Sequence, residues 1–237
     1  MATPWQELEG GRVRIDLEPH GQNGHFSGVI EINLKPDWKT YWKNPGNSGM
    51  EPVFYFDEPV NYQIFFPLPR LFKDGDDWSI GYKNNVLLPF VIEENKNNAH
   101  VSGHLTIGLC KEICVPLDLP FDFSNKSNMQ AAPTSLLALA RKKLPQQTPR
   151  DIKILANDDG KAVTIRITHP ENQEISALFL DGKSDEIGPA EIINQHPQET
   201  IFRAPIISKT GTTPLTITYS AEAKPDSFTG TVISQKK

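Results

Sequence analysis

The stretch that decides the fold is residues 101–123, VSGHLTIGLCKEICVPLDLPFDF. It places two strand-like runs, Val101–Leu109 and Val115–Phe123, around Cys110 and Cys114. On one straight strand, residues four positions apart would lie roughly 13 Å from each other, whereas the Cα atoms of a disulfide are about 4.4–6.8 Å apart. The chain must therefore turn between the cysteines if their sulfur atoms bond.

Two kinds of turn would bring the cysteines together. A helical turn leaves the Cβ atoms of residues i and i+4 about 5–6 Å apart, which exceeds the ~3.8 Å that a relaxed disulfide prefers. A tight hairpin, with the cysteines facing each other across its mouth, is the simpler solution. The sequence therefore predicts two antiparallel strands joined at the cysteine pair.

Strand patterns with a period of two continue outward from this hairpin. The clearest runs before it are Val13–Leu17, His25–Leu34, Val53–Phe56 and Val86–Ile92. The 20 prolines and 16 glycines are spread along the chain, which is typical of many short strands joined by turns. We expect residues 1–124 to form a β-sandwich that carries the cysteine pair.

The pattern changes after this first domain. Leu136–Lys143 favours a short helix with basic residues at its C-terminal end, and Pro145 and Pro149 prevent its continuation. We interpret residues 125–150 as a helical linker. Six or seven short strands then return over residues 151–237, so the predicted fold class is all-β, with two immunoglobulin-like β-sandwich domains joined by that linker.

Composition excludes several classes of partner. The formal net charge of −5 argues against nucleic acid, because phosphate binding requires a basic face. No window approaches 18 uninterrupted apolar residues, and no basic-then-apolar signal sequence opens the chain. We expect a soluble piece of a longer protein.

The sequence holds only two cysteines, and their chemistry has three interpretations. As a structural staple, a loop of about five residues contributes roughly 2 kcal/mol, which adds little to strands that a hairpin already joins. As a redox pair, the short spacing is an advantage, because one thiol can resolve a mixed disulfide that the other has formed. We favour the redox pair.

A metal site is the third interpretation. His100, His104, Cys110 and Cys114 form an H-x3-H-x5-C-x3-C series. Sulfur and imidazole ligands suit copper(I) or zinc, yet this spacing matches none of the usual structural zinc patterns. A copper or zinc module using His104 and both cysteines is therefore the alternative function, and the favoured interpretation includes no metal.

Three motifs resemble a known family. Residues 38–49, WKTYWKNPGNSG, resemble the W-x-T-Y-W-x-x-P-G-x-x-G segment of the periplasmic N-terminal domain of DsbD-like proteins. Gly81-Tyr82 followed by Leu88-Pro89, and Cys110-x3-Cys114-Val-Pro, resemble the same domain. The C-x3-C spacing and the additional C-terminal β domain are most similar to the ScsB branch, the suppressor of copper sensitivity proteins.

The resemblance implies a function. Such a domain is the outermost part of a membrane reductase, and it passes electrons from a membrane core and a thioredoxin-like domain of the same protein to soluble partners. Those partners would be periplasmic thioredoxin-fold proteins of the ScsC, DsbC or DsbG kind, with no bound cofactor. The second cysteine of the family forms the mixed disulfide, which implies that role for Cys114 and the resolving role for Cys110.

The family also has a cap loop whose aromatic residue covers the disulfide. The matching stretch is residues 76–82, with Trp78 as the first candidate for the shield and Tyr82 as the second. The alternative is that Trp78 packs into its own sandwich, as aromatic residues in β domains commonly do.

Two more residues are candidates for the cysteine pocket. Tyr41 and Trp42 are adjacent on one predicted strand, so they face opposite sides, and we expect Tyr41 to line the pocket while Trp42 joins the core. Asp77, with its neighbour Asp76, is a candidate for raising a cysteine pKa through its negative charge. The alternative is that both aspartates are ordinary solvated loop residues.

Overall fold

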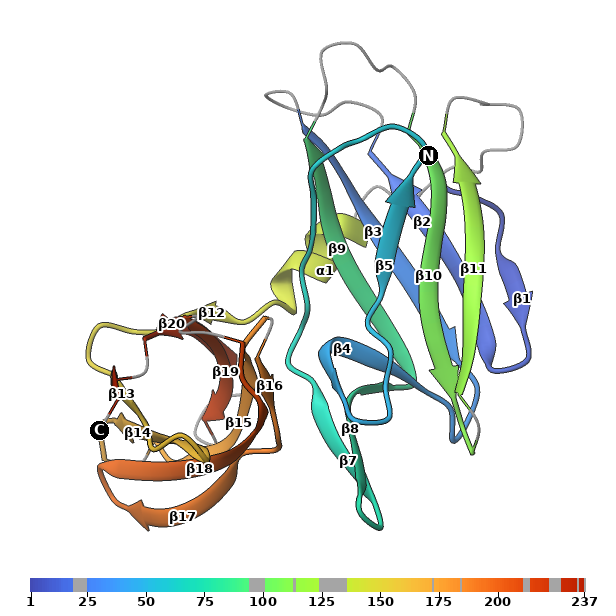
Figure 1. Cartoon of the computed structure of the whole chain (residues 1–237). Helices are drawn as coiled ribbons and strands as arrows, with labels where there is room; N and C mark the ends of the chain where they lie inside the picture. The colour runs from blue at the N-terminus through green and yellow to red at the C-terminus, as the bar shows by residue number, and fades with distance from the viewer. Residues whose placement is uncertain are drawn as a thin grey trace. The chain divides into compact units, whose positions relative to one another are not determined.

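The computed structural model describes residues 1–18, 25–93, 101–112, 114–123, 136–171, 173–183, 185–210, 214–221, 227–233 and 235–236. This part of the chain consists mainly of β-strands with one short helix (Figure 1), which confirms the all-β prediction. The chain divides into two compact units, Met1–Leu144 and Pro145–Lys237. The division falls inside the stretch 125–150 that the sequence assigns to a linker.

Two sheets make up the first unit. The first sheet has the order β1-β2-β3-β9-β6, with β1 (Gln6–Leu8), β2 (Gly11–Leu17), β3 (His25–Leu34), β9 (Asn85–Glu93) and β6 (Tyr62–Ile64). The second has the order β11-β10-β4-β8-β7, and β5 also pairs with β10. Its strands are β11 (Cys114–Asp122), β10 (Ser102–Cys110), β4 (Lys39–Gly46), β8 (Asp77–Lys83), β7 (Arg70–Asp74) and β5 (Val53–Phe56).

The sheets of the first unit face each other across an apolar core. On β3, Ile30 and Ile32 are fully buried, and on β10 so are Leu105 and Ile107. The spacing of two within each pair places its side chains on one face of their strand. Phe54 of β5 and Phe90 of β9 bring the two sheets together, with ring centroids 5.0 Å apart. Burying each such side chain contributes about 1.5–3 kcal/mol.

The helix α1 (Leu136–Lys142) covers the outer face of the first sheet. Leu137 and Ala140, three positions apart and therefore on one side of the helix, pack against Val29 of β3 and Leu87 of β9. Val29 points away from the sandwich core because its neighbour Ile30 points into it. The helix predicted as part of the linker therefore belongs to the first unit.

The second unit is another pair of sheets. One has the order β12-β20-β19-β15, with β12 (Gln146–Gln147), β20 (Ser227–Val232), β19 (Leu215–Ala221) and β15 (Ile175–Asp181). The other has the order β16-β18-β14-β13-β21, and β17 also pairs with β18. Its strands are β16 (Glu186–Ile187), β18 (Glu199–Ser208), β14 (Ala162–Thr168), β13 (Lys153–Asp158), β21 (Gln235–Lys236) and β17 (Glu191–His196).

Both sheets of the second unit contribute to one apolar core. Ile165 of β14 and Phe202 of β18 pack in the same cluster as Ile217 and Tyr219 of β19, and all four are buried. Among the residues of both units that the structure describes, no helix is long and apolar enough to cross a membrane.

Candidate redox site

The two cysteines close a β-hairpin, as the sequence predicts. Cys110 is the last residue of β10 and Cys114 is the first residue of β11, and the two are direct partners in the ladder. Their Sγ atoms form a disulfide, and their Cα atoms are 4.2 Å apart. The turn between the two strands therefore provides the close approach that a straight strand could not.

The phase of the hydrogen bonds explains why the pair is so close. The N–H of Phe123 donates to the carbonyl of Val101 at 2.9 Å, so the odd-numbered pairs of this ladder carry the hydrogen bonds. The even-numbered pairs, among them Gly108–Pro116 and the cysteine pair, then have none between them. Non-hydrogen-bonded pairs have the shorter Cα separation, about 4.5 Å, and Pro116 has no N–H to donate.

The two sulfur-bearing residues differ in exposure. Cys110 is 1% exposed because β10 lies between β11 on one side and β4 and β5 on the other, with Lys39 of β4 as its second partner. Cys114 is exposed because β11 is the edge strand of the sheet. Cys114 is therefore the more accessible residue of the pair.

Tyr41 lies against the disulfide. Its hydroxyl contacts the Sγ of Cys110 and lies 2.9 Å from the Sγ of Cys114. The ring fits between two glycines: a Cβ added at Gly108 would lie 3.0 Å from ring carbons, and one added at Gly49 would lie 2.7 Å from the ring. The missing side chains therefore make the slot that holds this tyrosine.

Burial raises the pKa of Tyr41 to about 12, because a phenolate would lose its solvation there. The hydroxyl is consequently protonated at any physiological pH and acts as a hydrogen-bond donor toward sulfur. In the reduced protein, such a donor favours a thiolate over a thiol. Tyr41 is thus the side chain whose hydroxyl lies against both sulfurs.

The end of β4 and the turn that follows it, residues 44–50, cover the same region. The carbonyl oxygen of Ser48 lies 3.4 Å from the Sγ of Cys114 and 3.5 Å from the Tyr41 hydroxyl. Gly46 has a φ of 88°, a left-handed conformation that glycine adopts without strain, and it lets the chain leave β4 here. We call residues 44–50 the covering loop.

Trp78 holds the covering loop from β8. Its main-chain N–H donates to the Oδ1 of Asn47 at 2.8 Å, and its main-chain carbonyl accepts from the Oγ of Ser48 at 3.2 Å. Trp78 itself is buried, with 7% of its surface exposed. Two main-chain hydrogen bonds therefore join Trp78 to the loop over the disulfide.

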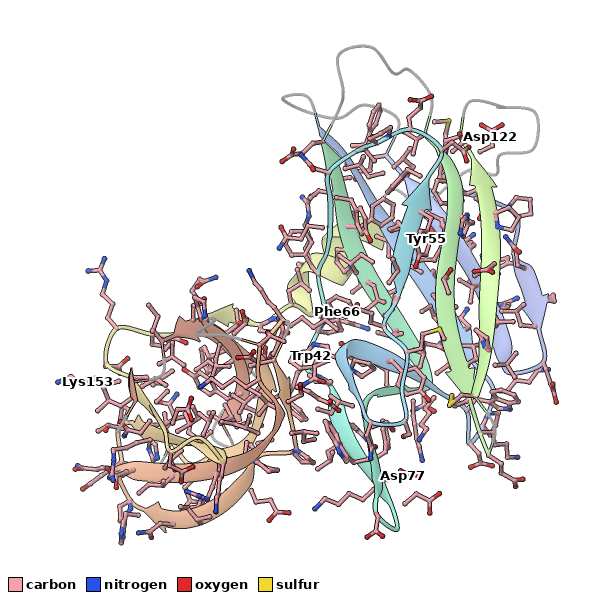
Figure 2. All side chains as sticks on the ribbon, viewed as in Figure 1. Trp42, Tyr55, Phe66, Asp77, Asp122 and Lys153 are labelled. Atoms are coloured by element: carbon pink, nitrogen blue, oxygen red, sulfur yellow. A yellow bond between two sulfur atoms is a disulfide. The ribbon has the colours of Figure 1, made fainter. Side chains whose placement is uncertain are left out.

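The other predicted pocket residues lie in different surroundings. Asp77 is exposed at the start of β8 (Figure 2), and its carboxylate accepts from the Nδ2 of Asn47 at 3.3 Å. Tyr82 is buried, and its hydroxyl donates to the carbonyl of Pro67 at 2.8 Å. Burial holds the pKa of Tyr82 well above its usual value. The structure thus brings Tyr41 to the sulfurs and Asp77 to the covering loop.

Gly49, Gly108 and Ser48 are site residues that sequence reasoning did not single out. Gly49 and Ser48 fall inside the resembling motif at residues 38–49, which was the available signal. Gly108 lies in a predicted strand, where an isolated glycine indicates a close approach of another group. That group is the Tyr41 ring.

The predicted metal ligands are not brought together. His104 is the ladder partner of Pro120, six residues before Cys110 on β10, which places it about 20 Å along the strand. Its imidazole stacks on Tyr55 with ring centroids 4.9 Å apart. His100 lies outside the described residues, among which no group of three His, Cys, Asp or Glu side chains could hold a metal ion. The alternative that combined His104 with both cysteines has no geometric support.

Comparisons with known proteins agree with this site. The family model for the N-terminal part of the thiol:disulfide interchange protein DsbD matches residues 9–123. Among solved structures, the N-terminal periplasmic domain of ScsB from Proteus mirabilis is similar, with a TM-score of 0.81, 17% sequence identity and 99% of each chain covered. A search of curated proteins with this sequence finds no significant match.

A disulfide across the mouth of an edge hairpin, inside the region that this model matches, defines a thiol–disulfide exchange domain. The first unit of the chain belongs to the DsbD N-terminal domain family. The two units together have the fold of the ScsB domain, which confirms the resemblance seen in the sequence.

Proposed function

We propose that this chain is the periplasmic exchange domain of a longer, membrane-embedded reductase. It relays electrons from the membrane core of that protein to soluble thioredoxin-fold partners through Cys110 and Cys114. The observation that carries the proposal is the unequal exposure of two bonded cysteines: Cys114 is exposed and Cys110 is buried. The family match over residues 9–123 supports it.

The exchange conserves electrons and protons. In the reduced domain, the thiolate of Cys114 attacks one sulfur of the partner's disulfide, a mixed disulfide forms, and the partner's other sulfur leaves as a thiolate. The thiolate of Cys110 then attacks the Sγ of Cys114, which releases the partner's second sulfur. The partner gains two electrons and takes up two protons, and the domain is left with its disulfide. The membrane core reverses the process and reduces the domain again.

Tyr41 and the covering loop have separate roles in this proposal. The Tyr41 hydroxyl stabilises the thiolate that each step requires, because it reaches both sulfurs. The covering loop, fastened to Trp78 through Asn47 and Ser48, shields the disulfide from small thiols until a partner displaces it. We therefore place the shield in the covering loop and assign Trp78 the support of that loop.

Trapping tests the assignment of the two cysteines. A Cys110→Ser variant should hold partners as stable mixed disulfides through Cys114, because the resolving thiol is gone. A Cys114→Ser variant should trap far less, since its remaining thiol is buried. Mass spectrometry of each variant after mixing with a periplasmic extract measures both, and equal trapping would overturn the assignment.

The reduction potential tests the function itself. A relay requires a disulfide that physiological dithiols reduce. A potential well below about −300 mV, together with no exchange with thioredoxin-like proteins, would identify a structural staple instead.

A further inference from the structure

Among the described residues, no strand pairs with the outer edge of β11, which begins at the exposed residue Cys114. β11 is the last strand in the order β11-β10-β4-β8-β7, and residues 114–116, where it begins, are all exposed. The edge of a sheet offers main-chain N–H and C=O groups to an incoming strand. A partner near Cys114 would meet the main-chain groups that this edge presents there.

The hydrogen-bond phase of the β10–β11 ladder determines which main-chain groups the edge presents near Cys114. Odd-numbered residues of β11 bond to β10, as the bond from Phe123 to Val101 indicates, so even-numbered residues direct their N–H and C=O groups away from β10. A side-chain contact agrees with this direction: the carbonyl of Pro120 accepts a hydrogen bond from the Nε2 of Gln6 at 3.3 Å. The open edge therefore presents Cys114, Pro116 and Asp118 in turn.

Two prolines limit what that edge can bind. Pro116 and Pro120 have no N–H, so between Cys114 and Asp118, about 13 Å apart, the edge has acceptors but no donor. Prolines at such positions prevent long strand pairing and aggregation. Cys114 keeps both its N–H and its C=O. The complete donor and acceptor pair at the start of this edge therefore belongs to the exposed cysteine.

We propose that the main chain of Cys114 is a docking point for the redox partner. An extended segment beside the partner's own reactive cysteine would pair with the N–H and C=O of Cys114 as a one-residue addition to the sheet. The two hydrogen bonds would fix the approach of the partner's sulfur to the Cys114 sulfur. They require no particular side chain in the partner, so one domain could serve several partners. This inference rests on the proposed function.

Amide hydrogen exchange in a trapped complex tests the docking point. The Cys110→Ser protein is joined through Cys114 to a bacterial thioredoxin whose resolving cysteine is serine, and the linkage is verified by mass spectrometry. The Cys114 amide should exchange at least about tenfold more slowly in the complex than in the free protein. The amides of Val115 and Leu117, which the ladder phase directs toward β10, are internal controls and should stay unchanged.

The outcomes separate the two proposals. If the mixed disulfide forms while exchange of the Cys114 amide is unchanged, the docking point is wrong and the exchange function stands. If neither thioredoxin nor any other thioredoxin-fold protein mixed with the Cys110→Ser protein forms a mixed disulfide, the proposed function itself fails.

A matched pair of variants gives a second test. Pro116→Ala restores an N–H on the open edge next to Cys114, and it disturbs no bond to β10 because the Gly108–Pro116 pair has none. The KM for the partner should fall several-fold while kcat stays nearly constant. Pro120→Ala restores an N–H where Gln6 already contacts the edge, so its KM should not change. Equal KM values for the two variants would contradict the docking point.

Discussion

Two fully buried tyrosines, one in each unit, show how a β-sandwich acquires chemistry. Tyr219 is part of the apolar core of the second unit, where its ring lies 5.5 Å from that of Phe228. Tyr41 is equally buried, yet it lies between two glycines, and its hydroxyl reaches the disulfide. The first tyrosine packs within an apolar core, and the second lies beneath the covering loop with its hydroxyl against both sulfurs.

The redox site is therefore a local departure from an ordinary β-sandwich. Both units fill their cores with side chains from alternate strand positions. Only the first carries cysteines, and there the hairpin between β10 and β11, the Tyr41 slot and the covering loop meet at one end of a sheet. Changes to the cores should therefore alter stability unit by unit, and changes at the hairpin should alter chemistry most.

The largest expected effect comes from truncating one core at a time. Leu105→Ala in the first unit and Ile165→Ala in the second each remove a fully buried side chain and should lower the free energy of unfolding by about 2–5 kcal/mol. Tryptophan fluorescence during urea unfolding reports the first unit alone, because all four tryptophans are there. They are Trp5, Trp38, Trp42 and Trp78.

The two variants should separate stability from chemistry. Ile165→Ala should leave the fluorescence midpoint and the exchange rate unchanged while circular dichroism shows a weakened second unit. A parallel loss of exchange activity in Ile165→Ala would mean that the units are not independent in this respect.

The next effect is on acid stability, where the units should respond with opposite signs. Burial raises the pKa of Asp16 in the first unit from 3.8 to about 6. The folded state then binds more protons than the unfolded chain between these values, so stability falls as the pH rises through them. The change should be on the order of 2 kcal/mol, and Asp16→Asn should abolish it in urea titrations at pH 4 and pH 7.

Asp159 of the second unit provides the opposite case. Hydrogen bonds from Arg203 and from backbone N–H groups lower its pKa from 3.8 to about 2. Its stabilising effect is therefore complete above pH 3.8 and is lost as the pH falls toward 2. Circular dichroism of Asp159→Asn between pH 2 and pH 5 should show a weaker acid dependence than the unaltered chain.

A smaller effect is expected from removing one hydroxyl. Tyr41→Phe keeps the ring between Gly49 and Gly108 and deletes the donor to sulfur. Hydrogen bonds to charged groups contribute about 1.5–3 kcal/mol, so the pKa of the more reactive thiol should rise by about one unit or somewhat more. The pH dependence of iodoacetamide alkylation in the reduced protein measures this pKa, and Tyr219→Phe is the matched control that should not change it.

The smallest effect concerns the covering loop. Asn47→Ala removes the side-chain oxygen that accepts a hydrogen bond from the main-chain N–H of Trp78. Such a hydrogen bond stabilises the closed loop by about 0.5–1.5 kcal/mol. Reduction of the disulfide by glutathione should become roughly two- to tenfold faster. Ser176→Ala, which removes a hydrogen bond to Ser220 in the second unit, is the control. An unchanged glutathione rate in Asn47→Ala would remove the covering loop as a shield.

Much of the fold was predictable because it depends on local periodicity. Alternation along β3 and β10 predicts the strands, and the three-residue spacing of the cysteines predicts the hairpin. The same alternation separates Tyr41 from Trp42. The covering loop was not predictable, because it approaches Cys114 through Ser48, 66 positions away in the sequence, and no pattern within a strand encodes such a contact.

The cap expected at residues 76–82 illustrates the same limit. Family resemblance indicated that stretch, and the structure joins it to residues 44–50 through Asn47, Trp78 and Asp77. The sequence indicated one of the two segments. Their contact depends on how β4 and β8 pair, with an irregular register between Tyr41 and Gly46.

By itself, the sequence determined that this chain forms two β-sandwiches and that its two cysteines meet at a turn, since both follow from side-chain alternation and chain reach. Tertiary structure alone decided which cysteine is exposed. Two chemically identical residues four positions apart became different because β10 lies inside a sheet and β11 at its edge, and strand order is set by contacts between residues far apart in the chain.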